Sequence, residues 1–238
     1  MKGLNGKRVL ITGGAGAIGT ATAKRFVEEG AHVDVFDRDE EACRRLKKDM
    51  PNLSGYMVVD VADPDVVARA FDELDKRAGG PDILINNAGI SLRHSFLDIT
   101  PQEWRTVLDI NLNGVFYVAQ QSARRMLAQG GGVILNMGSS NGLMGYHYYA
   151  DYNASKAGVI ELSRSMALEL GPAIRVNAVC PGFIMTPMQE AEYTPDMRKA
   201  FEKKLPLNRL GAPEDVAALF VFLASDEAGF ITGQYFVI

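Results

Sequence analysis

The sequence has few of the features that mark secreted, membrane-spanning or nucleic-acid-binding proteins. Its 238 residues include two cysteines, Cys43 and Cys180, too few for a disulfide framework and without a metal-ligand spacing. No apolar run approaches the ~20 residues of a spanning helix, and residues 1–7 lack the apolar stretch of a secretory signal. Acidic residues outnumber basic ones by 29 to 25, so the net charge of −4 offers no general attraction to a phosphate backbone. We therefore expect a cytoplasmic protein with reduced thiols and no metal site, whose partner is neither nucleic acid nor a membrane.

Short β-branched runs alternate along the chain with longer amphipathic segments. Strands are predicted at Arg8–Thr12, His32–Asp37, Tyr56–Val61, Ile83–Ile85, Val133–Leu135 and Arg175–Val179. Helices are predicted at 18–29, from about residue 40, from Pro64, at 101–128 and at 149–170. Strands that alternate with helices form right-handed βαβ units, and no linker divides residues 1–238. The chain is therefore predicted to be a single α/β domain, a doubly wound parallel β-sheet flanked by helices on both faces.

A glycine-rich loop follows the first predicted strand. Gly14, Gly16 and Gly19 form the pattern G-x-G-x-x-G just before a predicted helix. Glycines there let the backbone approach a pyrophosphate at the helix N-terminus. The chain has 24 glycines, so the pattern alone could be a turn without a ligand. Its position between a predicted strand and a predicted helix is what favours a dinucleotide site. Asp37, at the end of the second strand, could accept hydrogen bonds from ribose hydroxyls, or simply cap a helix.

A tyrosine and a lysine stand four residues apart at the start of the last long helix. The spacing of Tyr152 and Lys156 places both side chains on one helix face, within reach of a shared ligand. Alone, such a pair usually belongs to a solvated face. Ser139 and Ser140 follow the fifth predicted strand and should reach the same edge of the sheet. Their presence there favours a catalytic role for Tyr152 and Lys156.

These motifs occur in the order of a known family. They are the 12–19 loop, Asn86-Asn87-Ala88-Gly89, Asn111, Ser139 thirteen residues before Tyr152, the Tyr152/Lys156 pair, and 181–186. Over essentially its whole length the sequence resembles the short-chain dehydrogenase/reductase family. One departure is Ala17, where the family has glycine and this chain has its glycine one residue earlier, at Gly16.

The resemblance implies a Rossmann-type fold and a hydride transfer between NAD(H) and a secondary alcohol or ketone. Tyr152 would be the general acid/base, and Lys156 would lower its pKa while binding the nicotinamide ribose. Ser139, rather than Ser140, would bond the substrate oxygen, and Asn111 would hold a water in a proton relay to Lys156. A free tyrosine has a pKa of ~10, and an ammonium together with an oxidised nicotinamide ring could supply the ~3–4 kcal/mol that a base near pH 7–8 requires.

The resemblance also implies a cofactor site that spans the carboxyl edge of the sheet. Its expected residues are Gly13, Gly14, Gly16, Ile18, Gly19, Asp37, Asp60, Val61, Asn87, Ala88, Gly89, Tyr152, Lys156, Pro181, Gly182, Ile184 and Thr186. Asp37 favours NAD over NADP, because its carboxylate would repel a 2′-phosphate. Arg38, the next residue, is the counter-argument, since an arginine there could bind that phosphate.

The substrate is less well defined. The expected contacts are Ser91, Ser139, Asn141, His147 and Tyr152, and residues 184–205 are predicted to form a lid, with Met188 and Tyr193 as further candidates. A polyol, sugar or cyclic alcohol suits Asp37 best. The alternatives are an NADPH-dependent 3-ketoacyl-thioester reductase and, from another class, a catalytically silent NAD-binding regulatory module. Substrate identity, stereospecificity and reaction direction stay open.

The two long helices carry more apolar surface than one sheet face covers. The surplus candidates are Phe116, Tyr117, Val118, Leu162, Met166 and Leu170. Relatives pair such helices across two-fold axes, so a homotetramer is predicted, with the alternative that these residues are monomer core.

Overall fold

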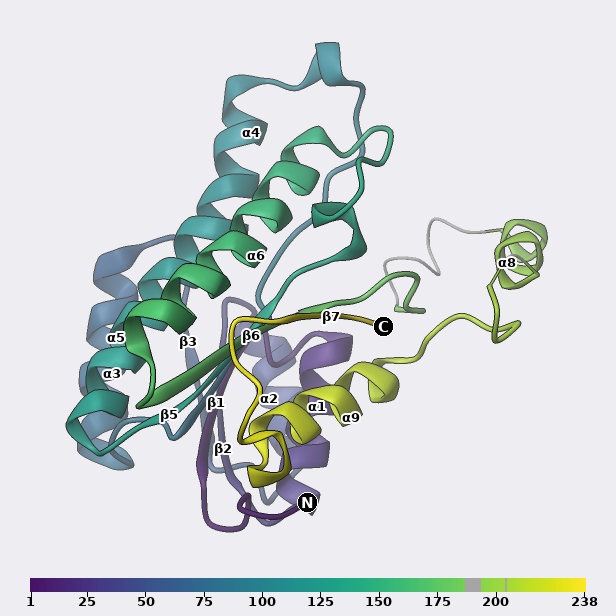
Figure 1. Ribbon diagram of the computed structural model, residues 1–238. Helices are drawn as coiled ribbons and strands as arrows, with labels where there is room; N and C mark the ends of the chain where they lie inside the picture. Colours follow the sequence, from purple (N-terminus) through teal and green to yellow (C-terminus); the bar gives the residue numbers. More distant parts are fainter. Residues whose placement is uncertain (187–193, 204) are drawn as a thin grey trace.

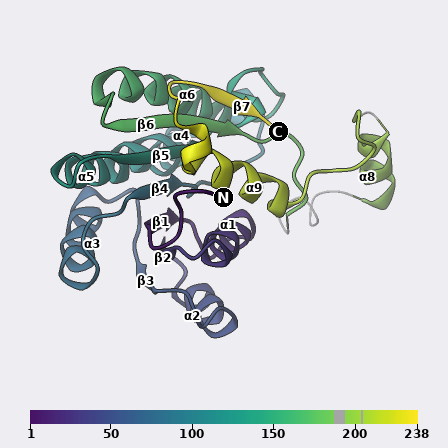
Figure 2. The same cartoon turned by 60° about the horizontal axis from the view of Figure 1, so that its bottom comes forward.

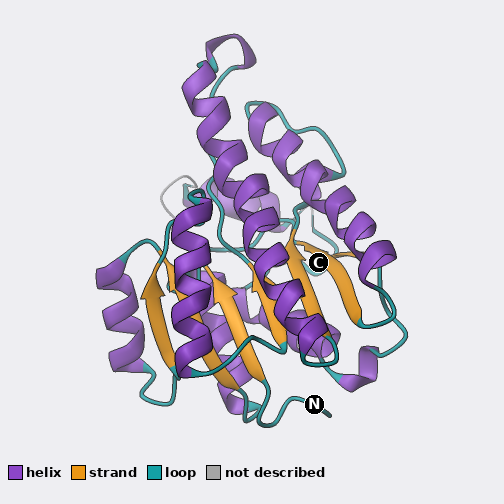
Figure 3. Cartoon of the chain, turned by 90° about the vertical axis from the view of Figure 1, so that its left-hand side faces the viewer, coloured by secondary structure: helices purple, strands orange, loops and turns teal. Residues whose placement is uncertain are grey.

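A parallel sheet forms the centre of the computed structural model, which describes residues 1–186, 194–203 and 205–238 (Figure 1). Its strands are β1 (Arg8–Thr12), β2 (His32–Asp37), β3 (Gly55–Val58), β4 (Ile83–Asn86), β5 (Gly132–Met137), β6 (Ile174–Cys180) and β7 (Tyr235–Val237). Their order across the sheet is β3-β2-β1-β4-β5-β6-β7, and every neighbouring pair is parallel. Figure 3 shows the strand arrows pointing towards one edge. The predicted doubly wound parallel sheet is confirmed.

Helices cover both faces of the sheet. They are α1 (Ala17–Glu28), α2 (Glu40–Asp49), α3 (Pro64–Arg77), α4 (Pro101–Leu108), α5 (Gly114–Ala128), α6 (Ala150–Leu170), α8 (Pro195–Glu202) and α9 (Pro213–Ala224). Figure 2 shows α1, α2 and α9 on one face and α3, α5 and α6 on the other, with α8 standing apart from the sheet. The fold is therefore three layers with two cores.

The two cores follow from the alternation of side chains along the strands. On β1, Val9 and Ile11 point into the core beneath α1 and α9, whereas Leu10 points into the core beneath α3 and α5. Because both faces are covered, the central strands are continuous apolar runs rather than alternating ones.

Capping residues set the helix starts that the sequence predicts. The Asp63 carboxylate accepts hydrogen bonds from the main-chain N–H groups of Asp65 and Val66, and Pro64 occupies the first turn of α3. Thr100 and Glu103 form a reciprocal capping box at the start of α4. Both starts satisfy main-chain donors that would otherwise lack partners.

Several element boundaries differ from the prediction. β3 ends at Val58 rather than Val61, because the Asp60 carboxylate accepts from the N–H of Ala62 and turns the chain towards α3. The predicted helix 101–128 is divided into α4 and α5 by a π turn at Asp109–Asn113. Val118 of α5 is fully buried in the core, so its assignment to a surplus surface was wrong.

Three C-terminal elements were not predicted from the sequence. α8 and α9 follow the last predicted strand, and the three residues of β7 are too few to give a periodic signal. The predicted lid, 184–205, is described in part: residues 187–193 and 204, and with them Met188 and Tyr193, lie outside the described residues. Within the described ranges, no helix is both long and apolar enough to cross a membrane.

The strand order reverses between β1 and β4. In doubly wound sheets the loops that follow such a pair of strands diverge and leave a crevice at the carboxyl edge. The loop after β1 is the glycine loop, and the loop after β4 carries Asn87, Ala88 and Gly89. The topology therefore brings two of the predicted motifs to one place.

Candidate active site

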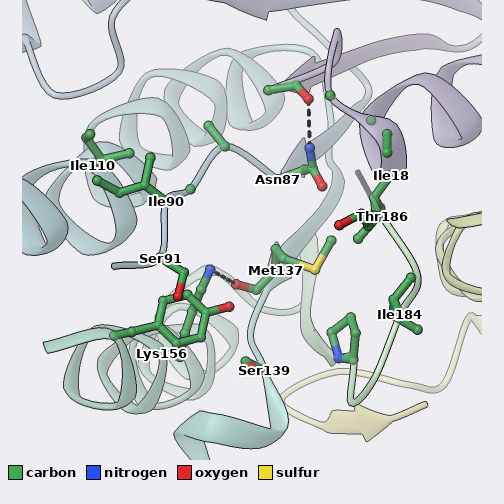
Figure 4. Close-up of a pocket in the computed structure, with 18 of the residues that line it drawn as sticks. Ile18, Asn87, Ile90, Ser91, Ile110, Met137, Ser139, Lys156, Ile184 and Thr186 are labelled. Atoms are coloured by element: carbon green, nitrogen blue, oxygen red, sulfur yellow. Dashed lines mark hydrogen bonds between the residues drawn. The ribbon is translucent and has the colours of Figure 1, made fainter. Parts of the chain in front are cut away.

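A cleft of about 710 Å³ runs along the carboxyl edge of the sheet, and both Asp37 and Tyr152 line it. Figure 4 shows part of its wall, with Asn87, Ser139 and Lys156 labelled. It is lined by every predicted cofactor residue except Gly14, namely Gly13, Gly16, Ile18, Gly19, Asp37, Asp60, Val61, Asn87, Ala88, Gly89, Tyr152, Lys156, Pro181, Gly182, Ile184 and Thr186. Gly14 packs behind the loop instead, where a Cβ would lie 2.6 Å from the Val35 side chain. Of the predicted substrate residues, Ser91, Ser139, Asn141 and Tyr152 line the cleft.

The glycine loop requires glycine at its tightest points. Gly13 has φ +62°, a conformation that side chains rarely adopt, and a Cβ there would lie 2.8 Å from the Ala88 Cα atom. A Cβ on Gly19 would lie 2.2 Å from the Gly13 carbonyl oxygen. Ala17, the departure from the family pattern, is the first residue of α1, where a methyl group is accommodated.

The chemistry of this loop suits a pyrophosphate. α1 begins at Gly16 without a side-chain cap and has no acidic residue in its first turn. Its first main-chain N–H groups and the positive end of its dipole therefore face the cleft without a competing carboxylate. A dinucleotide fits these residues: Gly13, Gly16 and Gly19 would hold the pyrophosphate, and Asp37 lies at the adenosine end.

The glycine loop and the loop after β4 are joined by hydrogen bonds. Thr12 Oγ1 accepts from the main-chain N–H groups of Asn87 (3.0 Å) and Ala88 (3.1 Å). The Asn87 side-chain amide donates to the carbonyl oxygens of Thr12 (3.1 Å) and Gly13 (2.9 Å). Asn87 therefore fixes the two walls of the cleft relative to each other.

The Asp37 carboxylate is held at the end of β2. Its Oδ2 accepts from the main-chain N–H of Ala15 at 3.0 Å, and its Oδ1 accepts from the N–H of Asp39 at 3.1 Å. These bonds leave acceptor positions on both oxygens. Arg38, Asp39, Arg45 and Asp60 also line the cleft, so with Asp37 three acidic and two basic side chains contribute to its wall.

The reactive end of the cleft contains Tyr152, Ser139 and Lys156. Ser139 lies near the Tyr152 phenol and acts to lower its pKa as a side-chain hydrogen-bond partner, and Ser140 has no such effect. Lys156 is 2% exposed, and its Nζ donates to the main-chain oxygen of Met137 at 2.8 Å, as Figure 4 shows. The Met137 carbonyl is a contact that sequence reasoning missed, because a main-chain acceptor leaves no residue signature.

Burial shifts the pKa values of both titratable groups. Desolvation raises the pKa of the Tyr152 phenol, although its hydrogen bond with Ser139 acts to lower it. Burial is the larger effect in the protein alone, where the Lys156 ammonium lies over the face of the tyrosine ring, 5.7 Å from its centre. The expected depression, which needs an oxidised nicotinamide ring as well as Lys156, stays a prediction. Desolvation also lowers the pKa of Lys156 to about 8.

Asn111 lies in the π turn between α4 and α5, behind the cleft rather than on its wall. Its side-chain oxygen accepts from the N–H of Ile90 at 2.8 Å, and its amide donates to the Ile90 carbonyl at 2.8 Å and to Ser155 Oγ at 3.1 Å. The side chain thus ties the loop after β4 to α6. Its part in a proton relay stays a prediction.

The structure separates one of the expected substrate residues, His147, from the cleft. His147 lines a second cavity of about 300 Å³, with Phe96, Tyr148 and Asn153 among its neighbours. The Arg93 guanidinium stacks on the Tyr148 ring, 4.7 Å from its centre. Tyr146 and Tyr149 line the cleft itself. In the described part of the chain, no group of three or more His, Cys, Asp or Glu side chains is arranged to hold a metal.

Comparisons with known proteins agree with this geometry. The family described as "Enoyl-(Acyl carrier protein) reductase" matches residues 13–238. A 3-oxoacyl-(acyl-carrier-protein) reductase of Thermotoga maritima is 41% identical, over 97% of this chain and 95% of that protein. An NADP-dependent (R)-specific alcohol dehydrogenase of Lentilactobacillus kefiri is 36% identical, over 99% and 96%. The crystal structure of gox2181 superposes with a TM-score of 0.93 at 36% identity, covering 98% of this chain and 94% of that one.

Proposed function

The chain belongs to the short-chain dehydrogenase/reductase family, and on that premise we propose that it transfers a hydride between NAD(H) and a secondary alcohol or ketone. One observation carries the proposal: Ser139, Tyr152 and buried Lys156 line one cleft together with Asp37, and the Lys156 ammonium lies 5.7 Å from the centre of the Tyr152 ring. A purely regulatory dinucleotide module has no use for a proton-transfer group.

In this proposal Tyr152 exchanges a proton with the substrate oxygen, and Ser139 orients that oxygen by a hydrogen bond. A nicotinamide ring, when bound, carries the hydride and, in its oxidised form, brings a positive charge towards the phenol. Because burial raises the pKa of Tyr152 in the protein alone, that charge and the Lys156 ammonium together must lower it. Asn111 holds Ile90, which lines the cleft, and ties it to Ser155 of α6.

The preference for NAD rests on Asp37. A 2′-phosphate would place up to two negative charges beside its carboxylate, and each like-charge pair at ~4 Å costs ~1 kcal/mol in water and ~4 kcal/mol at an effective dielectric of 20. The bonds from Ala15 and Asp39 hold the carboxylate in place, so it cannot easily swing away. We therefore predict at least a ~10²-fold preference for NAD, against the NADP named for the alcohol dehydrogenase of Lentilactobacillus kefiri.

The test of cofactor choice is kcat/KM with NAD(H) and NADP(H) for the wild type and for Asp37→Ala. The wild type should strongly prefer NAD, and the variant should lose most of that preference because the repulsion and the ribose acceptor are both removed. A wild type that uses both cofactors equally well would show that Arg38 and Arg45 govern this end of the cleft.

For the substrate, a polyol, sugar or cyclic alcohol remains the first candidate and a 3-ketoacyl thioester the second. The second is favoured by the names of the matching family and of the 41% identical relative. Absorbance at 340 nm separates them: NAD⁺ with a panel of secondary alcohols on one side, and NADH or NADPH with a 3-ketoacyl thioester on the other. Turnover with neither set, despite tight binding of NADH, would favour the silent regulatory module.

The homotetramer and the cytoplasmic location also stay proposals. Exposed apolar side chains support assembly: Phe116 of α5 is 43% exposed and Leu168 of α6 is 86% exposed. Tyr117, Met166 and Leu170, by contrast, pack partly against the monomer core.

A further inference from the structure

A buried carboxylate directly precedes Tyr152. Asp151 is 0% exposed and lies in the first turn of α6. Its Oδ1 accepts a hydrogen bond from the main-chain N–H of Tyr152 at 2.7 Å, and its Oδ2 lies 2.9 Å from Nε2 of His94. A carboxylate only accepts hydrogen bonds, so Nε2 of His94 carries the proton between them. Neither Asp151 nor His94 lines the cleft.

His94 joins three segments that pack around the active site. It belongs to the loop after β4, which also carries Asn87 and Ser91, and its main-chain N–H donates to the Tyr148 carbonyl at 3.1 Å. Two charged groups face its ring: Asp151 of α6, and Glu103 of α4, whose Oε1 lies 3.9 Å from Nδ1. The imidazole therefore bridges the wall of the cleft to the helix that carries Tyr152.

The start of α6 depends on this carboxylate. The N-cap position is Tyr149, whose side chain does not cap the helix. The Tyr152 N–H is one of the first-turn donors that an α-helix leaves without an internal partner, and Asp151 accepts it. A buried carboxylate is stable only when it is paired, and His94 supplies the second hydrogen bond.

We propose that His94 and Asp151 are positioning residues for the reaction. The pair fixes the first turn of α6, and through it the direction in which the Tyr152 hydroxyl points towards Ser139. Loss of the His94 ring frees the Asp151 carboxylate to turn away, which releases the Tyr152 N–H and loosens the phenol. The inference rests on the proposed function, because it assigns a role in the chemistry of Tyr152.

The kinetic test compares His94→Ala with His94→Gln, which keeps an N–H donor at similar reach. The control is Glu161→Gln, which breaks an exposed ion pair with Arg164 on α6, the helix that carries Asp151 and Tyr152. We expect His94→Ala to lower kcat by at least about tenfold while the KM for NADH and its Kd stay within about twofold. His94→Gln should restore at least about half of the activity, and Glu161→Gln should match the wild type. Unchanged kcat in His94→Ala, or a His94→Gln as poor as His94→Ala, would overturn the proposal.

A second readout does not need turnover. In protein labelled with ¹⁵N-tyrosine, the Tyr152 amide is one of eight signals and is assigned by its loss in Tyr152→Phe. Its hydrogen exchange should accelerate at least about tenfold in His94→Ala. Exchange at the wild-type rate would refute the pair's role. A wild type that oxidises no alcohol and reduces no ketone would instead refute the proposed function, and the exchange rates would still judge the pair.

Discussion

At the scale of single residues, the active end of the cleft is a balance between burial and charge. Lys156 keeps its ammonium buried, where Nζ donates a hydrogen bond to the Met137 carbonyl, and desolvation lowers its pKa to about 8. A lysine that binds its proton more weakly in the folded protein than in the unfolded chain destabilises the fold wherever it is charged. The buried Lys156 ammonium is a positive group at the point where a bound cofactor would meet Tyr152. Its burial lowers the stability of the folded state.

This balance predicts a pH dependence. Because the folded pKa of Lys156 is about 8 and the unfolded value is ~10.4, the unfolded chain binds more protons between these limits and stability rises with pH there. The free energy of unfolding of the wild type, minus that of Lys156→Met, should rise by about 2–3 kcal/mol between pH 7.5 and pH 10.5. Urea denaturation of both chains measures it.

The two buried thiols act in the opposite direction, since burial raises the pKa of Cys43 and of Cys180 to about 11. Both chains contain Cys43, so its contribution cancels in the difference. The Lys156 charge acts to lower the pKa of Cys180, so both chains should also carry Cys180→Ala. A difference that stays flat or falls with pH would mean that Lys156 is not destabilised by burial.

At the scale of elements, patterns that repeat or that need a special backbone were predictable from the sequence. The buried strands, the proline-capped helices and the glycine loop each leave a local signature, and β1, α3 and the loop after β1 lie where those signatures place them. The π turn around Asn111, the short strand β7 and the Met137 carbonyl depend on packing between segments distant in sequence. His147 was misplaced for the same reason: its nearness to Tyr152 along the chain says little about which cavity it faces.

The glycine loop gives a prediction about stability. A Cβ on Gly19 would meet the Gly13 oxygen and the Gly14 Cα atom at 2.2 and 2.6 Å, and both are main-chain atoms that cannot yield easily. A Cβ on Gly16 would lie 3.4 Å from its nearest neighbour. The melting temperature of Gly19→Ala should therefore lie at least ~5 °C below that of the wild type, because overpacking costs ~1–3 kcal/mol or more. The melting temperature of Gly16→Ala should be close to that of the wild type. Equal melting temperatures for the two variants would contradict the loop geometry.

At the scale of the whole molecule, the strand order brings the segments that follow β1, β2, β3, β4, β5 and β6, together with α6, to one edge of the sheet. The resemblance of motif order made this arrangement predictable, since each motif follows a strand. Contacts between chains are harder to predict from sequence than the fold of one chain, because an apolar helix residue can belong to a core or to an interface. Val118 is core, whereas Phe116 and Leu168 are exposed.

Assembly is testable by light scattering. A chain of 25.9 kDa that forms the proposed homotetramer should give about four times that mass at micromolar concentration. Leu168→Arg places a charge on the exposed face of α6 and should reduce the mass, because a desolvated arginine opposes the contact. Asn52→Arg, at an exposed position after α2 on the other face of the sheet, tests whether the effect is specific to the apolar patch. A monomer mass for the wild type would contradict the assembly.

The most direct test of the central claim is the turnover of Tyr152→Phe, measured at 340 nm with a substrate that the wild type accepts, beside a titration of NADH binding. The variant keeps the ring and loses only the hydroxyl proposed to transfer the proton. Proton transfer by Tyr152 predicts a loss of at least ~10²-fold in kcat, with NADH affinity unchanged within about twofold. Turnover near the wild-type rate would show that another group moves the proton and that the proposed mechanism is wrong.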